Sequence, residues 1–223
     1  MQRLSLGPGF DSWDAWPPVA MDPAREAVLG PAERQLVRLL FASGAIQAGG
    51  HYLYKSGRHS DVLVEKDLLL ARVAVTSKLC YQIAKHYFRS NVQAVAGPSM
   101  GGATMAQWVA YFLEPDPVAV YAENEDGHKV FRRGFADLIK SRRVLIVDDV
   151  VDTGGEAHRM IEAAKAAGGE IVGIGTLWNR GEPTLDGHQV FGLINQFFET
   201  YLPAECPMCR ANVPLVDATR LRP

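Results

Sequence analysis

The chain has 223 residues, of which 48% are hydrophobic, enough to bury the core of one large domain or two small ones. Its 23 basic and 25 acidic side chains nearly balance, which argues against a general nucleic-acid binder, so an anionic ligand must be held by a local site. Three cysteines cannot all pair internally, and 13 prolines with 21 glycines are an ordinary content, which disfavours a disulfide scaffold and a disordered chain. We therefore expect a globular protein of the reducing cytoplasm.

Residues 1–30 are predicted to form an irregular extension, because prolines and glycines interrupt every periodic pattern. Asp11, Asp14 and the Pro17-Pro18 pair break up the apolar run that a secretory signal needs. The longest apolar runs elsewhere fall far short of the roughly 20 residues that cross a bilayer, so we expect no membrane association. Met21 is an alternative start, and the sequence leaves open whether the preceding segment is a real arm.

Residues 31–66 are predicted to form a small N-terminal hood. Pro31 begins an apolar stripe of helical period that ends near Gly44, and two short strands follow at 51–55 and 61–65. Asp67 then opens a long amphipathic helix to about Phe88, whose predicted inward residues are Leu70, Val73, Leu79, Ile83 and Tyr87.

From residue 92 onward, strands and helices alternate. Strands are expected at 92–96, 118–122, 144–147 and 171–178, with helices at 103–112 and 156–167. This alternation predicts an α/β fold, in which a parallel sheet is flanked by helices on both faces. We place this core at residues 67–200 and a C-terminal tail at 201–223. Ligands of such sheets bind at the carboxyl ends of the strands.

The most informative segment runs from Arg143 to Glu156. Four branched apolar residues predict a buried strand, two acids (Asp148 and Asp149) follow, and Thr153, Gly154 and Gly155 open a helix. Glycines let backbone N–H groups converge on an anion, and the helix N-terminus favours negative charge, so this turn should hold a phosphate while the acids accept hydrogen bonds from sugar hydroxyls. Alone, an acidic pair is usually a solvated strand end and Gly-Gly a common turn; together on one strand, turn and helix they favour a site. The spacing fits neither the Walker loop nor G-x-G-x-x-G.

This segment resembles the phosphoribosyl pyrophosphate signature of the type I phosphoribosyltransferases. Four further segments are similar to motifs of the orotate phosphoribosyltransferase family: 53–61, the glycine loop 97–102, the 131–135 flank of a mobile loop, and the tail segment 203–209. Together they cover roughly residues 31 to 215 in matching order. The resemblance implies the type I phosphoribosyltransferase fold.

The resemblance also implies a reaction: transfer of the phosphoribosyl group from phosphoribosyl pyrophosphate to orotate, giving orotidine 5'-phosphate and pyrophosphate. The transition state is oxocarbenium-like, so the protein must orient the ribose and neutralise the departing oxygens. Mg²⁺ is implied as the cofactor, bound mainly through phosphoribosyl pyrophosphate, with Asp148 as a candidate protein ligand. The mobile loop reaches a neighbouring subunit in this family, which implies a homodimer.

The family motifs assign roles residue by residue. The implied catalytic residues are Asp148, Asp149, His128 and Lys129. The implied phosphoribosyl pyrophosphate site comprises Asp148, Asp149, Val150, Val151, Asp152, Thr153, Gly154, Gly155 and Glu156, with Lys55, Pro98, Ser99, Gly101 and Arg132. The implied base site comprises Asp152, Arg180 and Lys55, where the guanidinium of Arg180 would pair with the orotate carboxylate.

Two positions depart from the family pattern. Asn124 stands where the subgroup usually carries a catalytic lysine, leaving His128, Lys129, Arg132 and Arg133 as the loop's cations. Asp152 stands where orotate enzymes carry threonine and is similar to the aspartate of the 6-oxopurine phosphoribosyltransferases; alternatively, it caps the following helix. Two other functions therefore stay open: a phosphoribosyltransferase for another nucleobase, and a non-catalytic homologue that binds phosphoribosyl pyrophosphate.

The cysteines give a weaker signal. Cys206 and Cys209 form a C-x-x-C without a second Cys or His pair at zinc spacing, so we favour a buried structural pair over a metal site. Cys80 is expected in the core.

Overall fold

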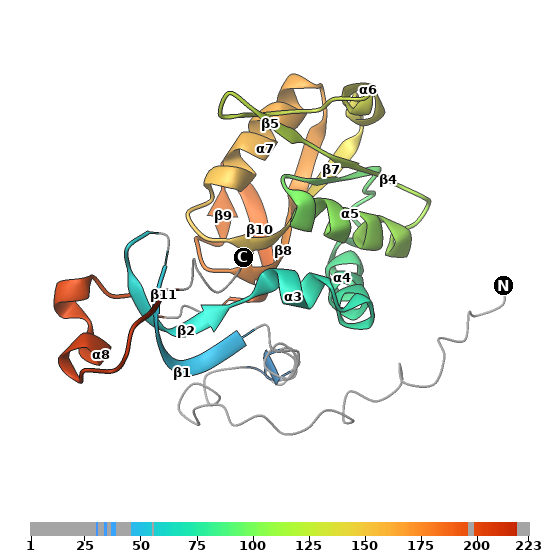
Figure 1. The fold of residues 1–223 in the computed structure, drawn as a ribbon. Coiled ribbons are helices and arrows are strands. Elements are labelled where there is room, and N and C mark those ends of the chain that lie inside the picture. The colour runs from blue at the N-terminus through green and yellow to red at the C-terminus, as the bar shows by residue number, and fades with distance from the viewer. Residues whose placement is uncertain are drawn as a thin grey trace.

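The computed structural model describes Gly30, Arg34, Val37, Arg38 and residues 46–54, 56–195 and 199–217 (Figure 1). Of the predicted first helix, Arg34, Val37 and Arg38 have helical backbone, and its other residues lie outside the described ranges. The predicted extension, apart from Gly30, also lies outside them. No helix in the described part of the chain is long and apolar enough to span a membrane.

A six-stranded sheet forms the centre of the molecule, in the order β4-β3-β7-β8-β10-β9. Its strands are β3 (Ala94–Gly97), β4 (Val118–Tyr121), β7 (Arg143–Val151), β8 (Glu170–Asn179), β9 (Thr184–Leu185) and β10 (His188–Ile194). All neighbouring pairs are parallel except β9 with β10. The predicted α/β class with a parallel sheet is confirmed.

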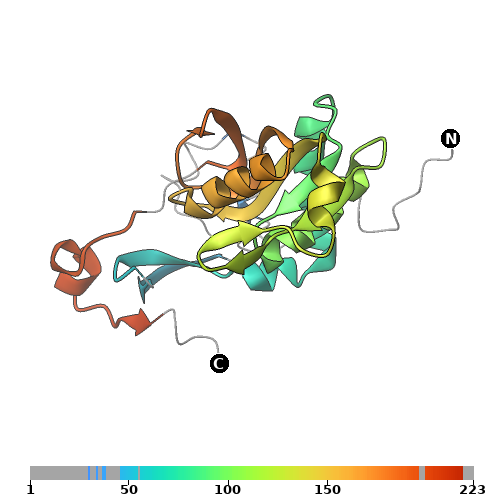
Figure 2. The ribbon, with the colours of Figure 1, turned by 90° about the horizontal axis from the view of Figure 1, so that it is seen from above.

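Helices cover both faces of this sheet (Figures 1 and 2). On one face, α4 (Val73–Tyr87) and α5 (Met100–Phe112) bury an apolar cluster that includes Leu79, Ile83, Met105 and Cys80. On the other face, α6 (Phe135–Ile139) and α7 (Gly155–Ala166) bury a second cluster around Met160 and Ile161. The burial of Cys80 agrees with its expected place in the core.

The long helix predicted from Asp67 to Phe88 is two helices, so that prediction was wrong. α3 (Lys66–Leu70) ends before Arg72, whose ψ of 83° is not helical, and α4 begins at Val73. The hydroxyl of Thr76 donates to the carbonyls of Leu69 (3.0 Å) and Leu70 (3.3 Å), which provides partners for the end of α3. The break turns Val73 outward: it is 60% exposed, not inward as predicted.

A small second sheet forms the hood. β1 (Ile46–Leu53) and β2 (His59–Val64) are antiparallel, in approximate agreement with the two predicted strands. The tail adds a third strand, β11 (Val216–Asp217), parallel to β1. Before it lie a 3₁₀ turn, η2 (Pro203–Glu205), and the short helix α8 (Pro207–Arg210), which pack beside the hood and away from the central sheet (Figure 2).

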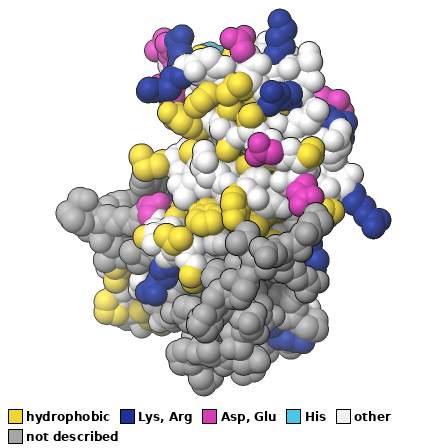
Figure 3. All heavy atoms as spheres, turned by 90° about the vertical axis from the view of Figure 1, so that its right-hand side faces the viewer, with side chains coloured by type: hydrophobic (Ala, Val, Ile, Leu, Met, Phe, Trp, Pro, Cys, Tyr) yellow, Lys and Arg dark blue, Asp and Glu magenta, His cyan; other side chains and the backbone are white. Residues whose placement is uncertain are grey.

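A two-stranded hairpin, β5 (Glu123–Glu125) and β6 (His128–Val130), occupies the segment that resembles the family's mobile loop. Charged side chains of both signs are interspersed on the face shown in Figure 3, without a continuous basic surface among the described residues of that face. This agrees with the balanced composition.

Candidate functional site

The candidate site lies where three neighbouring strands end. The sheet order places β7 between β3 and β8, and all three run parallel, so their carboxyl ends meet at one edge. The loop after β3 contains Pro98 and Ser99, the turn after β7 contains Asp152 to Gly154, and β8 is followed by Arg180. β7 continues to Val151 rather than ending at Val147, so the acidic pair lies within the strand and not after it.

The two acids are almost completely buried: Asp148 is 5% exposed and Asp149 is 2% exposed. Lys66, at the start of α3, places its ammonium 2.8 Å from Oδ1 of Asp149. Oδ1 of Asp148 accepts hydrogen bonds from the backbone N–H of Asp149 (3.0 Å) and from the hydroxyl of Ser99 (3.4 Å). Each carboxylate is therefore held in one orientation before any ligand binds.

Burial, together with the neighbouring charge of Asp149, raises the pKa of Asp148 to about 7. A cation or a set of hydroxyl donors would favour the ionised form of this carboxyl group. Ionisation of both buried acids is therefore unfavourable until a ligand binds, and such perturbed groups are common in functional sites.

The glycine loop packs directly against the acids. A Cβ at Gly101 would overlap Oδ2 of Asp149, and one at Gly102 would lie 2.9 Å from the carbonyl oxygen of Val147. The side chain of Ser99 accepts a hydrogen bond from the N–H of Gly102 (3.1 Å) and caps α5. Glycine is required at these two positions because the backbone at the start of α5 approaches β7 so closely.

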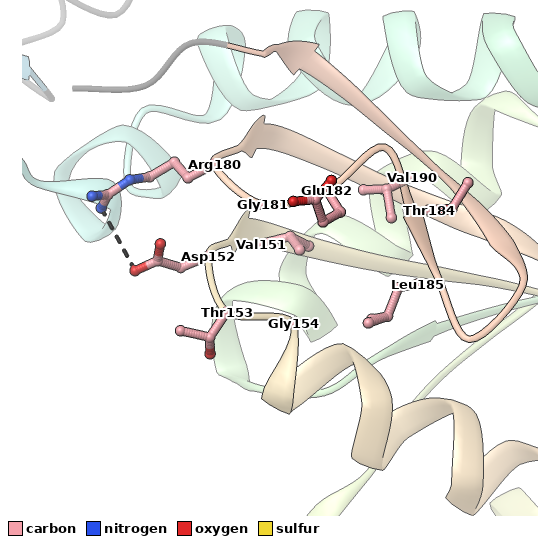
Figure 4. Close-up of a pocket in the computed structure, with 10 residues that line it drawn as sticks. All are labelled: Val151, Asp152, Thr153, Gly154, Arg180, Gly181, Glu182, Thr184, Leu185 and Val190. Carbon is pink, nitrogen blue, oxygen red and sulfur yellow. Dashed lines mark ion pairs between the residues drawn. The ribbon is translucent and has the colours of Figure 1, made fainter. Parts of the chain in front are cut away.

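The turn after β7 leads into α7 through Gly154, whose φ of 79° is left-handed. The first N–H groups of a helix have no acceptor within it, so the start of α7 at Gly155 and Glu156 offers donors to an anion. On one side of the turn lies a cavity of about 380 Å³, lined by Asp152, Thr153 and Gly154 with Val151, Arg180, Gly181, Glu182, Thr184, Leu185 and Val190 (Figure 4). Asp148 and Asp149 do not line this cavity.

Arg180 lies at the rim of that cavity with its side chain 15% exposed. Its guanidinium carbon lies 6.0 Å from the ring centre of Tyr54 and 5.8 Å from that of Trp178. Nη1 lies 3.9 Å from Oδ2 of Asp152, and Figure 4 shows the two side chains facing each other. Nε is buried without a hydrogen-bond partner in the described part of the chain. An unsatisfied donor of a rigid cationic fork is suited to a planar anionic ligand.

The cations of the hairpin have different surroundings. Lys129 is buried; its ammonium donates to the carbonyl of Pro98 and lies 2.7 Å from Oε2 of Glu156, so it bridges the β3–α5 loop and α7. Burial alone would raise the pKa of Glu156, but hydrogen bonds from Lys129 and Arg159 lower it below its ordinary value. His128 and Asn124 are exposed.

Arg132 and Arg133 pair with acids of their own hairpin, Glu125 and Glu123 respectively. Lys55, an implied ligand of the base and of phosphoribosyl pyrophosphate, lies outside the described residues. Val150 is partly buried against the core on the α4 and α5 face. Arg58, in the turn between β1 and β2, donates from Nε to the hydroxyl of Thr200 (2.8 Å).

Sequence reasoning missed two residues of this region. Lys66 pairs with Asp149 although it is 83 residues distant in sequence, and no local pattern indicates such a contact. Tyr54 packs against Arg180 from the hood; it lies in the family-like segment 53–61, which was the one available signal. Burial raises the pKa of Tyr54, so its hydroxyl stays protonated and donates to the carbonyl of Val62.

Comparison with known proteins decides the family. Residues 68–200 match the phosphoribosyl transferase domain family. The chain belongs to the phosphoribosyltransferase family. An orotate phosphoribosyltransferase of Caldanaerobacter subterraneus subsp. tengcongensis is 32% identical over 185 residues, covering 82% of this chain and 96% of that protein. One from Desulforamulus reducens is 35% identical over 179 residues, covering 79% and 92% respectively.

Solved structures agree with this phosphoribosyltransferase fold. The Mycobacterium tuberculosis orotate phosphoribosyltransferase has a TM-score of 0.61 at 19% identity and covers 74% of this chain and 96% of that chain. The Leishmania donovani UMP synthase has a TM-score of 0.60 at 22% identity, covering 74% of this chain and 36% of that one. The resemblance inferred from the sequence motifs is confirmed, and so is the predicted fold.

Proposed function

We propose that this phosphoribosyltransferase transfers the phosphoribosyl group of phosphoribosyl pyrophosphate to orotate, forming orotidine 5'-phosphate and pyrophosphate. The observation that carries the proposal is the buried pair Asp148 and Asp149, fixed between the glycine loop after β3 and the start of α7. Two relatives over 30% identical that match most of this chain are orotate phosphoribosyltransferases. This favours the orotate reaction over the purine and non-catalytic alternatives.

Each part of the site has a role in this proposal. The N–H groups at the start of α7, with the hydroxyl of Thr153, bind the 5'-phosphate. Asp148 and Asp149 accept hydrogen bonds from the ribose hydroxyls and hold the sugar while positive charge develops at C1. The loop of Pro98, Ser99 and Gly101 faces the pyrophosphate. Binding costs little reorganisation, because Lys66 and Ser99 already orient the acids.

Arg180 is the proposed partner of the orotate carboxylate. Its guanidinium carbon lies 6.0 and 5.8 Å from two aromatic ring centres, and its buried Nε lacks a partner among the described residues, so a bidentate carboxylate would satisfy it. Asp152 competes for this guanidinium, and because Asp152 is half-exposed, the competition is weak. The hood supplies Tyr54 and the proposed Lys55 as the remaining wall of the base site.

Mg²⁺ is the proposed cofactor. The donor set fits it, because carboxylate oxygens with substrate phosphates are the ligands that Mg²⁺ takes, and Asp148 has a raised pKa that a cation would reverse. When bound, the ion neutralises the charge of the departing pyrophosphate. Asp148 would hold it on the protein side, and Asp149 stays paired with Lys66.

We extend the proposal to a cytoplasmic homodimer in which the hairpin of β5 and β6 reaches the partner's site. His128 is exposed on this hairpin, and Arg132, exposed just after it, would exchange its pair with Glu125 for a neighbouring pyrophosphate, whereas Lys129 supports the hairpin from within. The outer side of α4 and α5 carries an aromatic cluster with exposed members, Tyr81 and Tyr111, packed on Phe112. Exposed aromatic clusters are typical of protein interfaces. Light scattering tests the proposed assembly, and we expect the mass of two chains.

The test is a substrate panel. The purified protein is mixed with phosphoribosyl pyrophosphate and Mg²⁺, and pyrophosphate release is followed with orotate, uracil, hypoxanthine, guanine and adenine in turn. We expect release with orotate alone, and loss of at least about a hundredfold in kcat/KM for Asp149→Asn with the fold intact. Asp116→Asn, in an exposed loop, is the matched control. Turnover with a purine, or binding of phosphoribosyl pyrophosphate without turnover on any base, would refute the proposal.

A further inference from the structure

Four potential metal ligands meet at the junction of the hood and the tail, outside the site described above. His51 is on β1, His59 is the first residue of β2, Cys206 precedes α8, and Cys209 is on α8. Their ligand atoms all lie within 4.8 Å of one another. Cys206 and both histidines are buried and Cys209 is half-buried; all the cysteines are free thiols. About 150 residues separate the histidines from the cysteines in sequence.

Three of the nitrogen–sulfur distances lie in the range of a tetrahedral site. With Zn–S of about 2.3 Å and Zn–N of about 2.0–2.1 Å, the ligand atoms of a Cys₂His₂ site are roughly 3.3 to 3.8 Å apart. Nε2 of His51 lies 3.4 Å from Sγ of Cys206 and 3.7 Å from Sγ of Cys209. Nδ1 of His59 lies 3.3 Å from Sγ of Cys209. The two imidazole nitrogens are 2.9 Å apart, which is less than about half an ångström short of their spacing in a tetrahedral site.

The surroundings orient one ligand for this role. Nδ1 of His51 is 2.8 Å from the carbonyl oxygen of Val213 and donates to it, which leaves the lone pair of Nε2 directed at the cluster. A histidine that ligates a metal almost always donates its other N–H to a carbonyl or carboxylate in this manner. The acceptor belongs to the tail, so the orienting contact also crosses the junction.

The tail has little else to hold its shape. Neither η2 nor α8 contains a buried residue, and Leu202, Val213, Leu215 and Val216 are exposed, whereas Cys206 is fully buried. A segment of this size without an apolar core usually depends on a disulfide or a metal. Two thiolates with two imidazoles are the donor set of structural zinc sites.

We propose that His51, His59, Cys206 and Cys209 bind one structural Zn²⁺ ion, which fastens the C-terminal tail to the hood. The sequence-based preference for a thiol pair without a metal is replaced by this site. The four protein ligands leave no open position, so the ion has no part in the chemistry at Asp148 and Asp149. It fixes the hairpin whose next residue, Tyr54, packs on Arg180.

The test measures metal in the full chain, purified under reducing conditions without an affinity histidine tag. Inductively coupled plasma mass spectrometry should measure a content of one zinc ion per chain. Cys206→Ser and Cys209→Ser should lose it; Cys209→His should retain it, since an imidazole replaces the thiolate. Cys80→Ala removes a thiol from the core and is the matched control for cysteine content. Chelation should lower the Tm and speed tryptic cleavage after Arg210, which is exposed on α8.

A second measurement needs no variant. Co²⁺ added to the metal-free native chain should produce the visible bands of tetrahedral cobalt and the ultraviolet charge-transfer bands of cobalt thiolate. Three results would each overturn the proposal: absence of zinc after incubation with Zn²⁺, an unchanged zinc content in Cys206→Ser and Cys209→Ser, or a Cys206–Cys209 disulfide in protein kept reduced.

Discussion

The substitution Asp148→Asn should make the protein more stable while inactivating it. The carboxyl group of Asp148 is buried beside Asp149, and its pKa rises from 3.8 to about 7. At 1.36 kcal/mol for each pKa unit, keeping this group ionised in the folded state costs up to about 4 kcal/mol above pH 7. Asparagine has the same shape and no charge, and its amide oxygen still accepts from the N–H of Asp149. Its NH₂ group needs a partner, which reduces the net gain to about 1–3 kcal/mol.

The sign of the pH dependence follows from linkage. The folded state of the wild type holds the Asp148 proton more tightly than the unfolded state does, so its free energy of unfolding falls as pH rises from about 4 to about 7. The amide does not titrate. The advantage of the variant should therefore be small at pH 4.5, grow up to pH 7 and stay constant at pH 8. At 2–4 °C per kcal/mol, the Tm should rise by roughly 2 to 12 °C at pH 8.

Thermal unfolding followed by circular dichroism at pH 4.5, 7 and 8, without ligand or Mg²⁺, measures this. Asp116→Asn is the control: Asp116 is exposed with a φ of 77°, which asparagine adopts readily, so its Tm should change by less than about 1 °C. A variant that is no more stable than the wild type at pH 8, or an advantage equal at pH 4.5 and pH 8, would refute the reasoning. The same preparation should lose about a hundredfold or more in kcat/KM.

Three further substitutions test separate parts of the site. Gly101→Ala places a methyl group against Oδ2 of Asp149 and should break the ion pair of Asp149 with Lys66, which lowers both the Tm and kcat/KM. In Gly155→Ala the nearest atom to the new methyl group would be Nη1 of Arg159 at 3.7 Å, so this variant should keep the Tm and raise only the KM for phosphoribosyl pyrophosphate. An equal Tm for the two variants would contradict this. Asp152→Thr removes the acid that faces Arg180 and should lower the KM for orotate by about two- to fivefold, which is the range for a solvent-accessible ion pair. An unchanged KM would instead favour a role of Asp152 in capping α7.

Much of the fold could be predicted because local pattern and tertiary structure agree. The apolar strand at 144–147 and the helix from 156 sit where periodicity placed them, within a residue or a few. The single helix from Asp67 to Phe88 failed for a tertiary reason: the hydroxyl of Thr76 bonds to carbonyls at the end of α3, and propensity alone does not register such a contact. The short strands β5, β6 and β9 carry too few residues to produce a pattern.

The residues of the site also divide into those that a local sequence pattern indicates and those that only the tertiary structure brings together. The acidic pair and the glycines that approach it are adjacent in sequence or belong to recognisable loops, so motif reasoning reached them. Lys66 and the zinc cluster depend on side chains brought together by the fold. His51 and His59 are separated by a hairpin turn rather than by a helical or zinc-finger spacing, so a search for paired ligands along the chain passed over them. The burial of the Lys129 ammonium between the β3–α5 loop and α7 is likewise a tertiary contact.

The third strand of the hood has a consequence for how the protein is made. β11 lies beside β1, and the backbone of Tyr201 pairs with that of His59, so the hood joins segments from the beginning and the end of the described chain. The central sheet is complete at Ile194, once β10 has been synthesised. During translation the strands bearing the acidic pair can assemble first, and the hood closes only after the residues of β11 leave the ribosome exit tunnel.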